Sequence, residues 1–350
     1  PGRPRAAGVG TVRVRTSWWY HGPMRAVVAQ RPGGPEVLEL VELPDPRPGP
    51  GEVVVRVTAA GVNFIDTYRR SGVYPMPYPH VVGSEGAGEI VAVGPSVDTL
   101  RPGQRVCWYS ALGSYAELAV VKAAEAIVVP SGVDDQAAAA LAMQGITAHY
   151  LTASTVPLAA GDDVLLHAAA GGVGLLATQL ATLRGARVIG TVGSPEKEQL
   201  ARQAGAAEVI RYRELADLTQ DLPPLVRHLT GGVGVRVAYD SVGKDTFDAS
   251  LACVRPRGTV VLFGGSSGQV PPFDLQRLNA AGSLYVTRPS IGAYTQTRAE
   301  LDWRTGELFR LLADGMLSVR IGAVFPLARA GEAHRALETR STTGKVLLTV

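Results

Sequence analysis

The feature that most constrains the fold is a glycine-rich turn between an apolar strand and a helical run. Residues 164–174 read Val-Leu-Leu-His-Ala-Ala-Ala-Gly-Gly-Val-Gly, so Ala169 stands where a phosphate-binding turn usually has its first glycine. Gly171 would let the backbone approach a pyrophosphate, and Gly174 would let the following helix pack tightly on the strand. Free N–H groups at the helix N-terminus would attract the anion. The predicted dinucleotide contacts in this turn are Gly171, Gly172, Val173 and Gly174.

Strands and helices alternate after this turn, which gives the glycines the context that an isolated triplet lacks. The predicted strands are Val164–Ala168, Arg187–Val192, Glu208–Ile210, Val235–Asp240, Thr259–Gly264 and Leu284–Thr287. The predicted helices include Val173–Leu183, Pro195–Ala204 and Thr246–Val254. This alternation predicts an α/β fold with a doubly wound parallel sheet.

The chain before and after this region has a different texture. From Met24 to about Val129, short β-branched runs are separated by Gly and Pro, as in a small, mostly β domain. After a helix at Arg298–Ala313, the chain ends in another apolar strand, Lys345-Val-Leu-Leu-Thr-Val. We therefore expect residues 148–286 to form a dinucleotide-binding domain inserted into a substrate domain made of residues 24–147 and 287–350.

Composition and charge exclude several other classes of protein. Residues 1–23 carry four arginines and no acid, and we interpret them as an extension outside the fold. The rest has 30 basic and 31 acidic residues, which argues against nucleic acid as the main partner. No apolar run is long enough to span a membrane. Two distant cysteines favour a reduced, cytoplasmic protein over a disulfide framework.

The end of the second predicted strand favours NADP over NAD. An enzyme that uses NAD usually places an acid there to bind the ribose 2′-hydroxyl, but Val192 is followed by Gly193 and Ser194. Lys197 can reach a 2′-phosphate from the next helix, although most lysines in such positions are simply solvated. The predicted contacts in this part of the cofactor site are Gly193, Ser194, Lys197 and Tyr212.

Several segments together resemble the quinone oxidoreductases related to zeta-crystallin, a zinc-free branch of the medium-chain dehydrogenase/reductase superfamily. The resemblance spans about Met24 to Val350 and rests on five segments. These are the glycine-rich turn, Gly61-Val-Asn-Phe-Ile-Asp-Thr-Tyr-Arg-Arg-Ser-Gly72, Gly83-Ser-Glu-Gly-Ala-Gly88, Tyr239-Asp-Ser-Val-Gly243 and Gly282-Ser-Leu-Tyr-Val-Thr-Arg-Pro289. It implies a Rossmann domain inserted into a GroES-like domain, with NADPH as cofactor.

The resemblance also carries expectations about metals. Zinc alcohol dehydrogenases of this superfamily hold their catalytic metal through Cys, His and Cys, whereas the matching positions here are Asn63, Ser84 and Gln144. Amides and a hydroxyl are poor zinc ligands. His80 and Glu85 lie nearby in the sequence, and we expect structural roles for both. No metal site is expected.

Hydride transfer to a quinone requires mainly that donor and acceptor be held close together in a dry cleft. A donor aimed at the developing oxyanion would assist, and Asn63 and Tyr68 are the candidate catalytic residues, although Tyr68 could equally be only a wall of the pocket. The remaining cofactor contacts implied by the resemblance are Phe64, Asp66, Thr147, Tyr150, Ser241, Phe263, Gly264, Ser266 and Arg340.

The leading hypothesis is therefore an NADPH:quinone oxidoreductase that transfers a hydride, or electrons, to a small-molecule quinone or other electron-poor acceptor. An alternative enzyme is a reductase of activated C=C bonds in enones, alkenals or enoyl thioesters. A non-enzyme alternative is an NADPH-binding crystallin-like or RNA-binding protein. The resemblance further implies a homodimer in which the strand near Leu284–Thr287 pairs with its copy.

Overall fold

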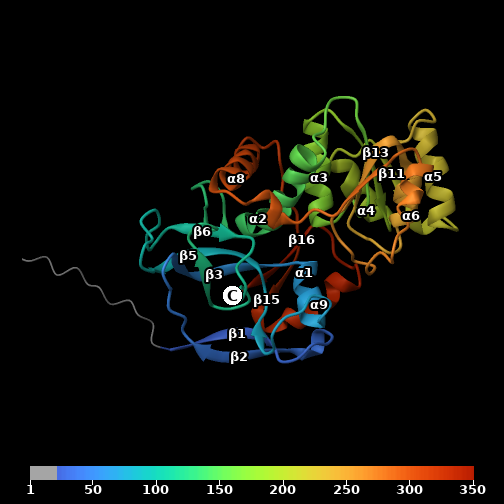
Figure 1. The fold of residues 1–350 in the computed structure, drawn as a ribbon. Coiled ribbons are helices and arrows are strands. Elements are labelled where there is room, and N and C mark those ends of the chain that lie inside the picture. Colours follow the sequence, from blue (N-terminus) through green and yellow to red (C-terminus); the bar gives the residue numbers. More distant parts are fainter. Residues whose placement is uncertain (1–21) are drawn as a thin grey trace, which may run out of the picture.

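The computed structural model describes residues 22–350 and contains three β-sheets with helices packed around them (Figure 1). The predicted extension at residues 1–23 lies almost wholly outside the described residues. β1 (Pro23–Ala29) begins one residue before Met24. Within residues 22–350, no helix is both long enough and apolar enough to cross a bilayer.

The six-stranded sheet confirms the predicted doubly wound α/β fold. Its order is β11-β10-β9-β12-β13-β14, and every neighbouring pair is parallel. The strands are β9 (Asp163–Leu166), β10 (Arg187–Val192), β11 (Glu208–Arg211), β12 (Val235–Asp240), β13 (Val254–Leu262) and β14 (Tyr285–Thr287). The chain reverses its direction across the sheet between β9 and β12, and ligands of such sheets bind in the crevice at this point.

Helices cover both faces of this sheet because its central strand is apolar on both sides. Val164 and Leu166 of β9 share a core cluster with Leu180, whereas Leu165 packs into another cluster with Leu222 and Val226. Such burial on both faces is typical of parallel sheets. The connecting helices are α3 (Gly172–Leu183), α4 (Pro195–Gln203), α5 (Leu218–Leu229), α6 (Phe247–Cys253) and α7 (Gln276–Ala280).

The other two sheets are formed by the two ends of the chain. A seven-stranded sheet has the order β15-β16-β3-β5-β6-β8, with β7 paired to β3. The C-terminal strand β16 pairs antiparallel with β3, so the chain returns to its first sheet as the sequence predicts. The strands are β3 (Glu52–Val62), β5 (Glu85–Val93), β6 (Arg105–Trp108), β7 (Leu118–Lys122), β8 (Ile127–Val128), β15 (Ile321–Pro326) and β16 (Lys345–Thr349). A small sheet joins β1, β2 (Leu38–Pro44) and β4 (His80–Val81).

Helix α2 (Asp135–Tyr150) packs against both β5 and α3 and so joins the two halves of the molecule (Figure 1). It continues into a short π-helix at Leu151–Thr155. The remaining helices are α1 (Phe64–Ser71), α8 (Arg298–Ala313), α9 (Ala330–Glu338) and four 3₁₀ turns, Pro35–Val37, Tyr212–Glu214, Ile291–Tyr294 and Leu327–Arg329.

Several predicted boundaries shift by one or two residues, and the largest difference lies at the start of β13. The helix predicted at Thr246–Val254 spans Phe247–Cys253, and β13 starts at Val254 instead of Thr259. The helix therefore runs directly into the strand. The residues between Val254 and Thr259 lie where β13 has a register shift against β12.

Candidate active site

The glycine-rich turn adopts the tight conformation that its sequence predicts. Ala168 has a left-handed φ of 54°, and the Gly171 N–H donates to the Ala168 carbonyl at 2.9 Å. A Cβ at Gly174 would lie 2.3 Å from that carbonyl oxygen, and one at Gly172 would lie 1.9 Å from the Gln144 side-chain oxygen. Side chains are therefore excluded, and the first N–H groups of α3 remain for a ligand.

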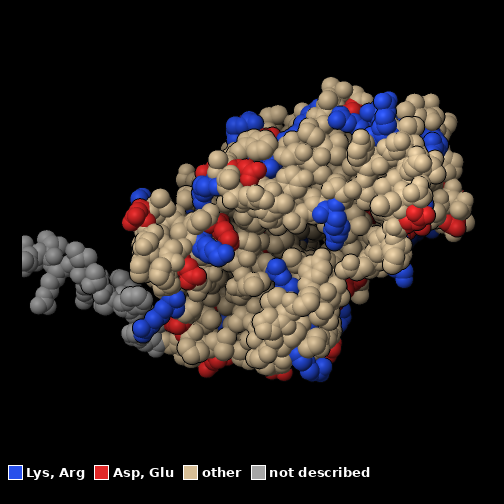
Figure 2. Space-filling view, in the orientation of Figure 1, with Lys and Arg blue, Asp and Glu red and all other residues tan. Residues whose placement is uncertain are grey.

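A cleft of about 720 Å³ opens beside this turn. Figure 2 shows a hollow near the middle of this face with basic side chains beside it. Both predicted catalytic residues and most predicted cofactor contacts line the cleft. These residues are Asn63, Phe64, Tyr68, Thr147, Tyr150, Gly171, Gly172, Val173, Gly174, Gly193, Lys197, Tyr212, Ser241, Phe263, Gly264, Ser266 and Arg340.

Two predicted cofactor contacts, Asp66 and Ser194, are not among the residues that line the cleft. Ser194 is the N-cap of α4, and its hydroxyl accepts from the Lys197 N–H. The Asp66 carboxylate is buried and accepts from the Asn63 N–H at 3.0 Å and the Ser84 hydroxyl at 2.7 Å. Each of these side chains helps to start a helix, and their contacts with the cofactor remain predictions.

One end of the cleft is basic. The Lys197 ammonium donates to the Arg340 carbonyl at 2.7 Å, and a Cβ at Gly193 would lie 2.9 Å from the Tyr212 hydroxyl oxygen. Burial lowers the pKa of Lys197. Asp245 is the one carboxylate among the described residues that line the cleft. The strand end therefore presents cations and a hydroxyl, which fit a 2′-phosphate.

Tyrosine rings form the other end. Tyr68 meets Tyr74 edge to face with ring centres 5.5 Å apart, and Tyr150 stacks on Tyr294 at 4.5 Å with an angle of 5°. Burial raises the pKa of Tyr68 and of Tyr150 to about 12. Both hydroxyls therefore keep their protons at neutral pH and can act as hydrogen-bond donors.

A buried arginine fixes the tyrosine stack from behind. The Arg304 side chain donates to the Tyr294 carbonyl at 2.7 Å and to His149 Nδ1 at 3.1 Å. Arg304 is only 2% exposed. Because arginine can only donate, His149 Nδ1 is the acceptor, and its Nε2–H donates to Glu307 at 2.9 Å. This network anchors Tyr294, on which the Tyr150 ring stacks.

Buried neighbours engage both ends of the Asn63 side-chain amide. Its amide nitrogen donates to Glu85 at 2.7 Å and faces the Gly61 carbonyl at 3.4 Å. Its amide oxygen accepts from the Lys345 ammonium at 2.8 Å, and Lys345 also forms an ion pair with Glu85. Both charged side chains are fully buried. Both amide protons of Asn63 therefore already have acceptors within the protein.

Two of the three positions that match the superfamily's metal ligands are engaged in other contacts. The Ser84 hydroxyl donates to Asp66, and Asn63 belongs to the cluster with Glu85 and Lys345. Among the described residues, no group of three or more His, Cys, Asp or Glu side chains gathers in the way that ligands of a metal ion would.

Comparisons with known proteins place this geometry in a family. Residues 49–131 match the alcohol dehydrogenase GroES-like domain, and residues 172–305 match the zinc-binding dehydrogenase family. A quinone oxidoreductase of Pseudomonas aeruginosa is 48% identical over 318 residues, covering 90% of this chain and 96% of its own. The chain belongs to the quinone oxidoreductases of the medium-chain dehydrogenase/reductase superfamily.

Two further relatives are informative about the cofactor and about the electron acceptor. A crystal structure of the Escherichia coli quinone oxidoreductase in complex with NADPH superimposes with a TM-score of 0.90 at 44% identity. It covers 93% of this chain and 100% of that one. A 2-haloacrylate reductase of a Burkholderia species is 41% identical over 332 residues, covering 92% of this chain and 98% of its own.

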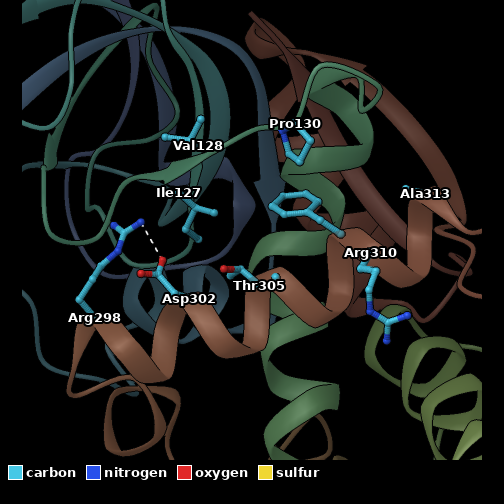
Figure 3. Close-up of a pocket in the computed structure, with 10 residues that line it drawn as sticks. Ile127, Val128, Pro130, Arg298, Asp302, Thr305, Arg310 and Ala313 are labelled. Atoms are coloured by element: carbon cyan, nitrogen blue, oxygen red, sulfur yellow. Dashed lines mark ion pairs between the residues drawn. The ribbon is translucent and has the colours of Figure 1, made fainter.

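A second cavity, of about 460 Å³, lies between α8 and the segment from Ile127 to Pro130 (Figure 3). Its wall carries the Arg298–Asp302 ion pair and the apolar side chains of Ile127 and Phe309. This second cavity is lined by none of the catalytic or cofactor-binding residues that the sequence predicts. The larger cleft is therefore the candidate active site.

Sequence analysis missed three residues that shape the site: Lys345, Arg304 and Arg288. Lys345 and Glu85 are far apart in the chain, and neither residue alone signals a buried pair. Arg288 lies within the Gly282–Pro289 segment that carries the family resemblance, but no function was predicted for its side chain. Arg288 and its neighbour Pro289 both line the cleft, so the position of Arg288 in this motif was the signal that could have identified it.

Proposed function

We propose that this protein is an NADPH:quinone oxidoreductase. The observation that carries the proposal is one cleft with a basic phosphate pocket at one end and tyrosine walls at the other. The glycine-rich turn lies between these ends. Similarity to quinone oxidoreductases over most of the chain supports the same activity.

The residues present fit NADPH. Lys197, Tyr212 and Arg340 would hold the 2′-phosphate, and the N–H groups at the start of α3 would hold the pyrophosphate. Thr147 and Tyr150 would flank the nicotinamide, together with Phe64. We retain Ser241, Phe263, Gly264 and Ser266 as further contacts.

NADPH, when bound, supplies the hydride. The protein's own contribution is to orient the acceptor and to exclude water from it, because a dry cleft strengthens every polar contact that the acceptor makes. Tyr68 is positioned by the capped helix α1 and by its packing on Tyr74. Its neutral hydroxyl would donate a hydrogen bond to the acceptor oxygen as negative charge develops there.

A panel assay tests the proposal. The oxidation of NADPH is followed by absorbance with benzoquinone, naphthoquinone, phenanthrenequinone, an enone and crotonyl-CoA as acceptors. We expect the quinones to give the highest kcat/KM. A clear preference for crotonyl-CoA would contradict this assignment.

Substitution of Lys197 tests the cofactor choice. We expect Lys197→Ala to weaken NADPH binding about tenfold, because a charge-assisted hydrogen bond to the phosphate is lost. NADH binding should change by less than about twofold, since the missing contact involves only the 2′-phosphate. Titration calorimetry measures both, and Lys122→Ala, at an exposed lysine outside the cleft, is the control. Equal weakening of NADPH binding and NADH binding would show that Lys197 does not contact the 2′-phosphate.

A second candidate function is the reduction of activated C=C bonds. One of the relatives favours it. That protein, named as a 2-haloacrylate reductase, is 41% identical to this chain, and a haloacrylate contains an activated C=C bond. The same cleft would hold a small unsaturated acid. The panel distinguishes the two functions directly, since an unsaturated acid can be added as a further acceptor.

We propose a homodimer formed through β14, a cytoplasmic location and the domain boundaries predicted above. Within the described residues β14 pairs only with β13, and Tyr285 is 63% exposed. An open edge with exposed apolar side chains favours pairing with a second copy. Gel filtration with light scattering tests the dimer.

The two cysteines, both buried and unbridged, fit a reducing compartment.

A further inference from the structure

Arg288 is the charged side chain at the tyrosine end of the cleft. It follows β14 directly and lines the cleft together with Tyr68, Tyr150 and Pro289. Burial raises the pKa of both tyrosines, and the Arg288 charge is close enough to oppose this rise at each hydroxyl. The guanidinium therefore lies within electrostatic reach of both.

This guanidinium is held in place but not neutralised. Its Nη1 donates to the Leu262 carbonyl, at the end of β13, over 2.9 Å. Among residues 22–350, no carboxylate oxygen lies within 4 Å of its nitrogens, whereas Arg187 in β10 of the same sheet forms ion pairs with Asp163 and Glu208. One carbonyl leaves most of the N–H donors of an arginine available.

The cofactor's phosphates already have partners elsewhere. Lys197 and Arg340 form the basic end of the cleft, and the turn before α3 supplies backbone N–H groups. The carboxylate in the cleft wall, Asp245, forms no ion pair with Arg288 within the described chain. The positive charge of Arg288 is thus left for the acceptor.

We propose that Arg288 is a specificity-determining residue that favours acceptors with a carboxylate beside the electron-accepting ring or double bond. This inference rests on the proposed function and adds a substrate class to it. The fork of N–H groups on a guanidinium matches the two oxygens of a carboxylate. Arg288 is itself solvent-exposed, and an acceptor seated against the tyrosine rings and Ile291 would cover part of it and so strengthen the contact.

The contact is one of recognition and changes no bond. The acceptor takes the hydride from NADPH and a proton from water or Tyr68, while the carboxylate remains an anion throughout. Because the reacting atoms gain negative charge, a nearby cation would also favour the step. The carboxylate itself should account for most of the effect, since it carries a full charge before the reaction begins.

A matched pair of acceptors tests this proposal. One is a naphthoquinone with a propionate side chain, and the other is the methyl ester of the same compound. We measure kcat/KM for both, and also their equilibrium binding by calorimetry with oxidised NADP present, so that no turnover occurs. The variants are Arg288→Met and Arg288→Lys, and Arg47→Met, at an exposed position outside the cleft, is the control.

We expect Arg288→Met to lower kcat/KM and binding for the propionate by about tenfold and to change those of the ester by less than about twofold. Arg288→Lys should retain part of the preference, because the charge remains while the two-pronged geometry is lost. High salt should reduce the preference of the wild type. Arg47→Met should behave as the wild type does.

Two results would overturn the proposal. One is an equal loss with both acceptors accompanied by a higher KM for NADPH, which would assign Arg288 to the cofactor. The other is no difference between acid and ester in any variant. If the wild type fails to reduce either compound, the proposed quinone reductase function fails instead, and calorimetry still reports on Arg288.

Discussion

Gly174→Ala is expected to lower kcat/KM for NADPH by about 100-fold, since small displacements of a bound reactant have effects of this size. The added methyl group would lie 2.3 Å from the Ala168 carbonyl oxygen and 2.9 Å from backbone atoms of Ala169. Backbone cannot move aside as a flexible side chain can, so the turn must distort. Overpacking of this kind should also lower the free energy of unfolding by about 1–3 kcal/mol.

The control is Gly306→Ala, in the middle of α8, where a Cβ would meet nothing within 4 Å. There we expect a gain of about 0.5–1 kcal/mol, because alanine is the better helix former. Urea unfolding and steady-state kinetics measure both variants. Wild-type affinity for NADPH in Gly174→Ala would show that the turn does not form the phosphate site.

Lys345→Met is expected to lower the free energy of unfolding by about 3–5 kcal/mol. Both members of the Lys345–Glu85 pair are fully buried, so the substitution leaves a carboxylate without a counterion inside the protein. Asn63 also loses the partner of its amide oxygen. Denaturant unfolding of the purified variant gives the change directly.

Two comparisons isolate the buried charge as the cause. The double variant Lys345→Met/Glu85→Gln should recover part of the loss, because the uncompensated charge is gone. Lys122→Met removes an exposed partner of Glu125 and should change stability by less than about 0.5 kcal/mol. If the free energy of unfolding of Lys345→Met lies within about 1 kcal/mol of the wild-type value, the buried pair does not stabilise the fold as its burial implies.

Local patterns in the sequence were enough to predict the sheet and the cofactor end of the site. The apolar run into the glycine-rich turn places β9 and α3, and the strand Arg187–Val192 matches β10 residue for residue. The missing acid after Val192 points to the basic pocket around Lys197. These features are encoded within a few neighbouring residues, which is why a single sequence reveals them.

The acceptor end depends on contacts between distant segments, and the sequence predicted less of it. Asn63 was predicted as a donor because it lies on the Gly61–Gly72 segment, and in the folded protein Glu85 and Lys345 engage its amide. Asp66 was taken as a cofactor contact, but burial and its hydrogen bond with Ser84 enclose it. Such pairings are decided by tertiary packing, and no local pattern announces them.

The central claim is that orientation in this cleft is enough for NADPH to reduce a quinone. The most direct test is to dialyse the purified protein against a chelator and then follow NADPH oxidation with naphthoquinone. We expect undiminished turnover, one hydroquinone formed per NADPH consumed, and a much lower rate with NADH. Loss of turnover on chelation that zinc restores, or failure to bind NADPH at all, would contradict it.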